Sequence, residues 1–400
     1  MARFDQSALF DRMAVEGHLT RSLLRGLADE IATFHASAES VAIPSGSKTM
    51  HSIVRGNEAE IAEGTPAVFD IETASLLSER TIRALKDVTA LLDDRAGQGC
   101  VRRCHGDLHL RNICLIDGRP VLFDGIEFND AFSVIDVLYD LAFLLMDLEH
   151  RGHRDSANLV FNRYLAMSGD LDGLAAMPLF LSCRAAVRAK TTAAAARADS
   201  EAAKSLEAEA CSYLDLACGL LEPRRPVLIA IGGLSGSGKS TLAQRLAPLA
   251  GGSPGALLLR SDVIRKRLFD MAPETALNAS GYTPEQSERV YRRLIESAAA
   301  ALSAGQSVIV DAVFARSDER AAIESVARDV GVPAHYLWLE APAEAMKKRV
   351  TERTGDASDA DAAVVQQQLS YDIGEMDWRR VSAGGDPERT VSISRGIVGL

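Results

Sequence analysis

Two patterns of hydrophobic and polar positions divide the chain. In the first half, apolar residues recur at the spacing of amphipathic helices. In the second half, short apolar runs of strand length alternate with longer amphipathic stretches. The segment between them, Glu222 to Pro226, ends the helical pattern, because proline cannot continue a helix and restricts the residue before it. The pattern therefore predicts two domains, 1–221 and 222–400.

The first domain is predicted to be mostly helical. Residues 36–64 carry Ser, Gly and Pro without steady periodicity, so we expect a long loop there. Two short apolar runs, 113–116 and 120–123, flank an Asp-Gly pair and predict a β-hairpin. The strongest helical patterns cover 68–94, 131–149 and 174–221.

The second domain is predicted to be α/β. Its apolar runs, interpreted as strands, are 227–231, 256–259, 307–310, 334–339 and 390–393. The amphipathic stretches, interpreted as helices, are 239–249, 284–304, 315–330, 342–353 and 360–374. Strands and helices that alternate at this length form a parallel sheet covered on both faces, so we expect a doubly wound sheet.

Composition and charge narrow the possible functions. Hydrophobic residues make up 47% and charged residues 25% of the 400, which is ordinary for a globular protein. The net charge of −11 argues against a general nucleic-acid binder, since affinity for phosphate backbones needs clustered Lys and Arg. No apolar run reaches the roughly 18 residues that cross a bilayer, and no signal-peptide core opens the chain. We therefore expect a cytoplasmic protein with reduced cysteines, and the pattern leaves the oligomeric state open.

The strongest chemical signal is the phosphate-loop motif GxxxxGK[S/T], which ends in Lys239 and Ser240. It follows a predicted strand and precedes a predicted helix, as such a loop requires. Its glycines let successive N–H groups point at phosphate oxygens, and the helix N-terminus adds positive potential. The residues expected to bind the nucleotide are Gly233, Ser235, Gly236, Ser237, Gly238, Lys239, Ser240 and Thr241. Lys239 would reach the β- and γ-phosphates, and the Ser240 hydroxyl would bind Mg²⁺.

Carboxylates follow two of the predicted strands. Asp262 comes just after the second strand, where it could accept a proton from a substrate hydroxyl, and Arg265 could bind substrate on the same helical face. The alternative for Asp262 is a simple N-cap of a helix at 263–269. Asp311 ends the third strand, as a carboxylate that supports Mg²⁺ would, although a turn residue is the alternative.

Positive charge gathers on the fourth predicted helix of this domain. A movable lid there could bring Arg349 or Arg353 over the transferring phosphoryl group and neutralise its charge. A solvated basic helix end is the alternative. With Asp262 and Arg265, these residues resemble small P-loop kinases: gluconate, shikimate and adenylate kinases and the 5′-hydroxyl polynucleotide kinases. The resemblance covers about 226–398, and it implies ATP binding without identifying the acceptor.

A second kinase-like motif, HGDLHLRN, begins at His105 in the first domain. Asp107, Asn112 and Asp124 are spaced like the catalytic Asp, the metal-binding Asn and the strand-end metal Asp of a kinase catalytic loop. The motif resembles the HGDxxxxN motif of the aminoglycoside phosphotransferase family. Its fusion to a P-loop domain resembles the group described as bifunctional aminoglycoside phosphotransferase/ATP-binding proteins. The resemblance implies that Asp107 orients or deprotonates a hydroxyl, while Asn112 and Asp124 bind Mg²⁺.

The first domain departs from that family in one respect. The family fold needs an N-terminal β-lobe with a lysine that grips the α- and β-phosphates, and no cluster of predicted strands precedes His105. Lys48 and Lys86 are the lysines in that stretch, and neither lies on a predicted strand. We therefore expect a kinase-like C-lobe that is N-terminally incomplete and a poor kinase by itself.

Together these features favour a kinase that uses ATP and Mg²⁺ to phosphorylate a hydroxyl of a small molecule through the second domain. One alternative is an ATP-binding regulatory module whose first domain is a degenerate phosphotransferase. The other is a polynucleotide 5′-hydroxyl kinase, for which one local basic cluster is available. That cluster consists of Arg260, Arg265, Lys266 and Arg267. The sequence identifies neither the phosphate acceptor nor the pathway.

Overall fold

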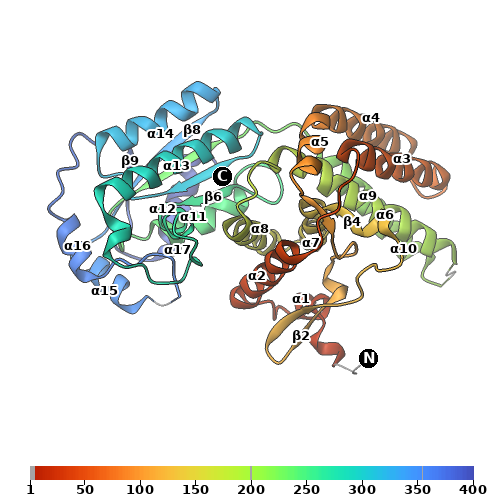
Figure 1. The fold of residues 1–400 in the computed structure, drawn as a ribbon, viewed down its shortest axis with the longest axis horizontal. Helices are drawn as coiled ribbons and strands as arrows, with labels where there is room; N and C mark the ends of the chain where they lie inside the picture. Colours follow the sequence, from red (N-terminus) through yellow and green to blue (C-terminus); the bar gives the residue numbers. More distant parts are fainter. Residues whose placement is uncertain (1–4, 199–200, 354) are drawn as a thin grey trace. The chain divides into compact units, whose positions relative to one another are not determined.

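The computed structural model describes residues 5–198, 201–353 and 355–400. The chain separates into two compact units, which we describe one at a time (Figure 1). Unit 1 comprises residues up to 164 and 173–223, and unit 2 comprises residues 165–172 and 224–400. Among the described residues, no helix combines the length and the apolarity needed to cross a membrane.

The first part of the chain is mostly helical, as the sequence predicted. The helices are α1 (Phe10–Val15), α2 (Arg21–Ser37), α3 (Gly46–Gly64), α4 (Ile71–Asp87), α5 (Thr89–Gly97), α6 (Asp130–Ser133), α7 (Val137–His150), α8 (Arg154–Ser168), α9 (Met177–Ala198) and α10 (Ala203–Leu220). Short 3-10 turns lie at Gln6–Ala8, Leu110–Asn112 and Leu174–Ala176. Two antiparallel pairs join them: β1 (Val101–Arg103) with β4 (Val134–Asp136), and the predicted hairpin, β2 (Ile113–Ile116) with β3 (Arg119–Leu122).

Helix α7 is the centre of unit 1. Every residue from Val137 to Leu148 is buried, as expected for a helix that is apolar around its whole circumference. Asp136 caps α7 by accepting a backbone N–H at 2.8 Å. The same carboxylate forms a two-point ion pair with Arg95, at 2.7 and 2.8 Å, and both side chains are buried. This ion pair fixes the start of the central helix against α5.

The loop predicted at 36–64 is wrong, because α3 occupies most of that segment. Ser45 caps α3, and its hydroxyl accepts a backbone N–H at 3.1 Å. Met50, Val54 and Ile61 lie on one face at helical spacing and are buried. The apolar stripe is narrow and is interrupted by polar residues and glycines, so its periodicity is weak in the sequence.

Unit 2 contains a five-stranded parallel sheet. The strands are β5 (Leu228–Gly232), β6 (Leu257–Arg260), β7 (Val308–Asp311), β8 (Ala334–Glu340) and β9 (Arg379–Ser382). They lie in the order β6-β7-β5-β8-β9, so β5 is in the middle and its neighbours are added on opposite sides. Ligands of doubly wound sheets bind at such a switch point, outside the carboxyl ends of the strands.

Helices cover both faces of this sheet, with α11 and α17 on one face and α13 and α14 on the other (Figure 1). The helices are α11 (Lys239–Leu246), α12 (Ser261–Arg267), α13 (Pro284–Ser303), α14 (Ser317–Val330), α15 (Ala343–Glu352), α16 (Ala362–Gln368) and α17 (Pro387–Val398), with 3-10 turns at Ala247–Leu249 and Ala279–Tyr282. Ile229 and Ile231 of β5 pack with Leu242 and Leu246 of α11 in a buried core. This core supports the strand and the helix that flank the phosphate loop.

The strand predicted at 390–393 is wrong, because these residues lie in α17. Asp386 caps the helix and Pro387 occupies its first turn, where proline is tolerated. The β-branched run resembles a strand in sequence, but the buried side chains follow helical spacing. They are Thr390, Ser394 and Val398. The fifth strand is instead β9, an edge strand whose one buried side chain, Val381, gave no strand signal.

Replacing Arg95 with Ala is expected to destabilise unit 1, because it leaves the Asp136 carboxylate buried without its partner. Loss of one partner of a buried ion pair costs about 3–5 kcal/mol, which corresponds to a melting temperature lower by roughly 10 °C. Circular dichroism on heating measures this shift. Arg55→Ala is the matched control: its ion pair with Glu58 is largely exposed, so we expect a shift below about 2 °C. A melting temperature of Arg95→Ala equal to that of the control would contradict this account of the helix start.

Candidate functional site

The phosphate loop connects β5 to α11 at the carboxyl edge of the sheet. Gly233, Gly236 and Gly238 have φ values of 139°, 78° and 102°, in the region that favours glycine. A Cβ at Gly236 would lie 2.4 Å from the carbonyl oxygen of Met346, so α15 approaches the loop too closely for any side chain there. The loop conformation therefore needs glycine at these positions.

Two hydrogen-bond donors of this loop are bound to protein oxygens that a phosphate could replace. The Ser235 N–H donates to the side-chain oxygen of Gln368 at 2.7 Å, and the Lys239 ammonium donates to the carbonyl of Leu234 at 2.9 Å. Among the described residues, the buried Ser237 hydroxyl has no hydrogen-bond partner. Burial lowers the pKa of Lys239, although Asp311 and Asp262 oppose this shift. A bound phosphate would accept hydrogen bonds from the Ser235 N–H and from Lys239, and its negative charge would favour the charged form of the lysine.

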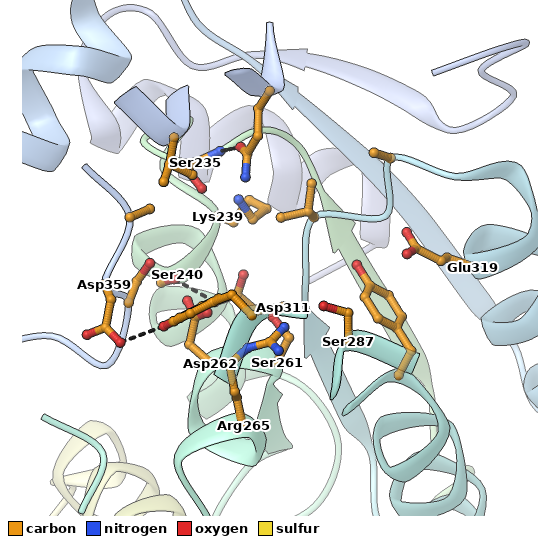
Figure 2. Close-up of a pocket in the computed structure, with 18 of the residues that line it drawn as sticks. Ser235, Lys239, Ser240, Ser261, Asp262, Arg265, Ser287, Asp311, Glu319 and Asp359 are labelled. Atoms are coloured by element: carbon orange, nitrogen blue, oxygen red, sulfur yellow. Dashed lines mark hydrogen bonds between the residues drawn. The ribbon is translucent and has the colours of Figure 1, made fainter. Parts of the chain in front are cut away.

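The expected metal ligands lie together. The Ser240 hydroxyl donates to Oδ2 of Asp311 at 2.6 Å, from the start of α11 to the end of β7 (Figure 2). Asp311 is buried at the carboxyl edge of the sheet. A hydroxyl and a carboxylate are the oxygen donors that Mg²⁺ prefers, and the rest of its shell is commonly water and nucleotide phosphate. The donor set therefore fits Mg²⁺.

Asp262 lies in the first turn of α12, inside the helix, because Arg260 is the residue at the N-cap position. The simple capping alternative is thus wrong. Figure 2 shows the Asp262 carboxylate facing the same space as Ser240 and Asp311. Burial raises the pKa of Asp262, with Asp311 adding to the shift and Arg260 opposing it. A carboxylate with a raised pKa is a better proton acceptor, as general-base chemistry needs.

Arg265 lies one turn further along α12 and is buried. Its Nη1 donates to the carbonyl of Gly281 at 2.7 Å, and its guanidinium carbon lies 4.8 Å from the centre of the Tyr282 ring. Its Nε has no hydrogen-bond partner in the part of the chain that the structure describes. Since buried donors are normally paired, this N–H is available to a substrate oxygen.

The two arginines predicted on a lid are both bound to backbone carbonyls. Arg349 donates to Gly236 at 3.3 Å and to Ala383 at 2.8 Å, so it links α15 to the phosphate loop and the sheet. Arg353 donates to the carbonyls of Ser358 and Ala360 at 3.1 and 3.0 Å. Neither is a freely solvated helix end, and both side chains line the same cavity.

One cavity of about 1580 Å³ brings these residues together. The predicted residues in its lining are Ser235, Gly236, Gly238, Lys239, Ser240, Thr241, Asp262, Arg265, Asp311, Arg349 and Arg353. Gly233 and Ser237 lie behind them, outside the lining. Ser287 and Glu319 form the wall opposite the phosphate loop (Figure 2). The cavity exceeds the usual range of about 300–1,000 Å³ for one small ligand, so it has room for a nucleotide and an acceptor.

Sequence reasoning missed the carboxylates that neutralise the basic cluster. Arg260 pairs with Asp311 and with Asp356, at 3.3 and 2.9 Å. Lys266 is fully buried and pairs with Asp359. Asp356 and Asp359 come from the loop after α15, far along the chain from α12. The acidic character of that loop was the only available signal, and it does not identify a partner.

The second motif lies in unit 1, where Asp107 and Asn112 are close together. The Asn112 amide donates to the carbonyl and to the carboxylate of Asp107, both at 2.9 Å. Burial raises the pKa of Asp107, but His109, Asn112 and Arg184 outweigh it and hold that pKa below the usual range. Asp124 follows β3, is exposed and has a φ of 60°. It makes no hydrogen bond or ion pair to another described residue.

A buried carboxylate fixes the backbone of this second motif. Asp140 of α7 accepts the N–H groups of His105 and Gly106 at 3.1 and 2.9 Å. It also bonds to His35 at 3.1 Å, and Arg184 lies 3.7 Å away. The sequence gave no reason to single out Asp140, since it sits within an apolar helical run. The motif is thus rigidly held, with an ionised Asp107 at its edge.

Two family models match the chain. Residues 8–179 match the phosphotransferase enzyme family, and residues 228–371 match the AAA domain family. These matches fall on the helical unit with the HGD motif and on the unit with the phosphate loop.

Similar proteins cover nearly all of the chain or a part of it. An uncharacterised protein of Mycobacterium tuberculosis is 28% identical over 402 aligned residues, which cover 98% of this chain and 78% of that protein. An adenylyl-sulfate kinase of Myxococcus xanthus is 29% identical over 117 residues, 29% of this chain and 59% of that protein. The solved structure of a gluconokinase from Sinorhizobium meliloti is 20% identical and covers 44% of this chain and 97% of its own, with a TM-score of 0.30. The two family matches identify the chain as an ATP-dependent kinase, whose first part matches the phosphotransferase enzyme family and whose second part matches the AAA domain model.

Proposed function

We propose that the chain transfers the γ-phosphoryl group of ATP to a hydroxyl of a small molecule, and that the cavity of unit 2 is the site of transfer. One observation carries this proposal: a single cavity holds the phosphate loop, the Ser240–Asp311 pair and a carboxylate with a raised pKa, Asp262. These are the groups that bind a triphosphate, support its metal and accept a proton from an attacking hydroxyl.

The phosphate loop and Lys239 would bind the triphosphate. Backbone N–H groups at the start of α11 would donate to the β-phosphate, and the Lys239 ammonium would leave the Leu234 carbonyl for phosphate oxygens. Mg²⁺, held by Ser240 and supported by Asp311, would neutralise charge on the phosphates. Because these donors are fixed before the reaction, they stabilise developing charge without reorganising.

Asp262 and Arg265 would position the acceptor. The Asp262 carboxylate would accept the hydroxyl proton as the hydroxyl oxygen bonds to the γ-phosphorus and the bond to ADP breaks. The unpaired Nε of Arg265 would donate to another oxygen of the acceptor. Placing the hydroxyl against the phosphorus contributes to the rate because it removes the entropy cost of the encounter.

The charges of α12 support a small acceptor over a polynucleotide. Lys266 is buried and paired with Asp359, and Arg260 is buried and paired with Asp311 and Asp356. These two members of the predicted basic cluster therefore offer little free positive charge to a phosphate backbone, whereas Arg267 is exposed. Glu319 on the opposite wall adds negative charge, which also disfavours a polyanion.

Lys239→Ala is expected to weaken ATP binding by about 10- to 100-fold, because a charge-assisted hydrogen bond to phosphate is lost. Titration of the purified chain with a fluorescent ATP analogue measures this affinity. Lys348→Ala is the matched control, since Lys348 is largely exposed and its ion pair with Glu352, at 3.9 Å, is exposed as well. Unchanged ATP binding in Lys239→Ala would contradict the assignment of the phosphate loop.

Asp262→Asn is expected to lower acceptor-dependent ATP turnover by about 100- to 10,000-fold while ATP binding is retained. A metabolite pool screened for ATP consumption supplies the acceptor. Because burial raises the pKa of Asp262 above 3.8 and only the ionised form accepts a proton, the wild-type rate should fall on acidification at a pH above the usual aspartate range. The variant should lack this acidic limb.

Asp107→Asn is the counterpart in unit 1, and we expect it to keep turnover near the wild-type rate. The opposite result, with turnover lost in Asp107→Asn and kept in Asp262→Asn, would place the transfer in unit 1. Absence of acceptor-dependent turnover in the wild type, with ATP binding intact, would favour the ATP-binding regulatory module.

A further inference from the structure

The guanidinium of Arg260 lies within the expected metal site. Arg260 is the last residue of β6 and is buried. Its Nη2 donates to the Ser240 hydroxyl at 3.1 Å, and its Nε donates to Oδ2 of Asp311 at 3.3 Å. A fixed positive charge therefore contacts both side chains that the proposed function assigns to Mg²⁺.

The hydroxyl of Ser240 shows why the Arg260 guanidinium and a metal ion would compete for the same position. Its only hydrogen is donated to Asp311, at 2.6 Å, so the rest of the oxygen presents lone pairs (Figure 2). The Arg260 N–H points at this lone-pair side, which is also the side that a metal ion needs. A divalent ion there would meet a unit positive charge within a few ångströms, in a buried place where solvent screens poorly.

A second carboxylate, that of Asp356, also accepts hydrogen bonds from the guanidinium of Arg260. The same Nη2 donates to Asp356, at 2.9 Å to one oxygen and 3.2 Å to the other. The Asp356 carboxylate is itself held by the N–H of Ser358 at 3.0 Å. Arg260 can therefore give up the longer contact to Asp311 and keep a charged partner, which avoids the high cost of an unpaired buried charge.

We propose that Arg260 is a built-in counter-charge of the metal site. In the nucleotide-free chain Arg260 neutralises Asp311 and donates a hydrogen bond to Ser240. When a divalent cation enters with the nucleotide, Arg260 gives up these contacts and keeps those to Asp356. The proposal rests on the proposed function, because Ser240 and Asp311 are its metal residues. Its consequence is that the free chain binds divalent metal weakly and accepts the metal chiefly together with phosphate.

Binding of Mn²⁺ alone to the full chain, measured by electron paramagnetic resonance without nucleotide, tests this role. Arg260→Gln is expected to bind Mn²⁺ at least about tenfold more tightly than the wild type, because the competing charge is gone. Arg260→Lys keeps the charge and is expected to stay within about threefold of the wild type. Adding Asp311→Asn should remove the gain in the Arg260→Gln chain and change the wild type little.

Arg316→Met is the control for general charge effects, since Arg316 lines the same cavity but is exposed and pairs with Asp318. It should bind Mn²⁺ like the wild type. Arg260→Gln that binds no more tightly than the wild type, or a gain that Asp311→Asn leaves intact, would overturn the role of Arg260. If Arg260→Gln did not fold, a tenfold gain in Arg260→Lys would overturn it equally. Failure of the proposed function would be distinguished from failure of this role, because the wild-type chain would then not bind Mg·ATP.

Discussion

The backbone between β5 and α11 must turn sharply through three glycines with positive φ, and the rest of unit 2 packs around this turn. The middle position of β5 places the turn at the switch point of the sheet, and α11 packs on that sheet through Leu242 and Leu246. The close approach of Met346 to Gly236 leaves no room for a side chain in the loop. The fold therefore fixes the shape of the loop to which the proposed function assigns phosphate binding.

Opposite charges are buried together beside this cradle. Burial lowers the pKa of Lys239 and raises that of Asp262, because removal from water disfavours both charged forms. Asp311 is stabilised by Arg260 and by the Ser240 hydroxyl. Binding of phosphate and metal would be electrostatically favourable at such a site. The phosphate charge would pair with Lys239, and the metal charge would pair with Asp311. The same burial raises the proton affinity of Asp262, as a general base requires.

The sequence predicted what depends on local order and missed what depends on distant partners. The phosphate loop, Asp262 and Asp311 follow directly from apolar runs that end in glycine or carboxylate, because parallel strands bring their carboxyl ends to one edge. Helix α3 and strand β9 were missed since their apolar positions are few and only their packing makes them regular. The pairing of Arg260 with Asp356 joins segments far apart in the chain, which no local spacing encodes.

The most direct measurement is a crystal structure of the full chain with Mg²⁺ and a non-hydrolysable ATP analogue. The account predicts the β-phosphate within hydrogen-bond distance of the amides that precede Lys239, with the γ-phosphate directed toward Asp262. An analogue bound elsewhere, such as beside Asp107 and Asn112, with the loop of unit 2 free of phosphate, would contradict it.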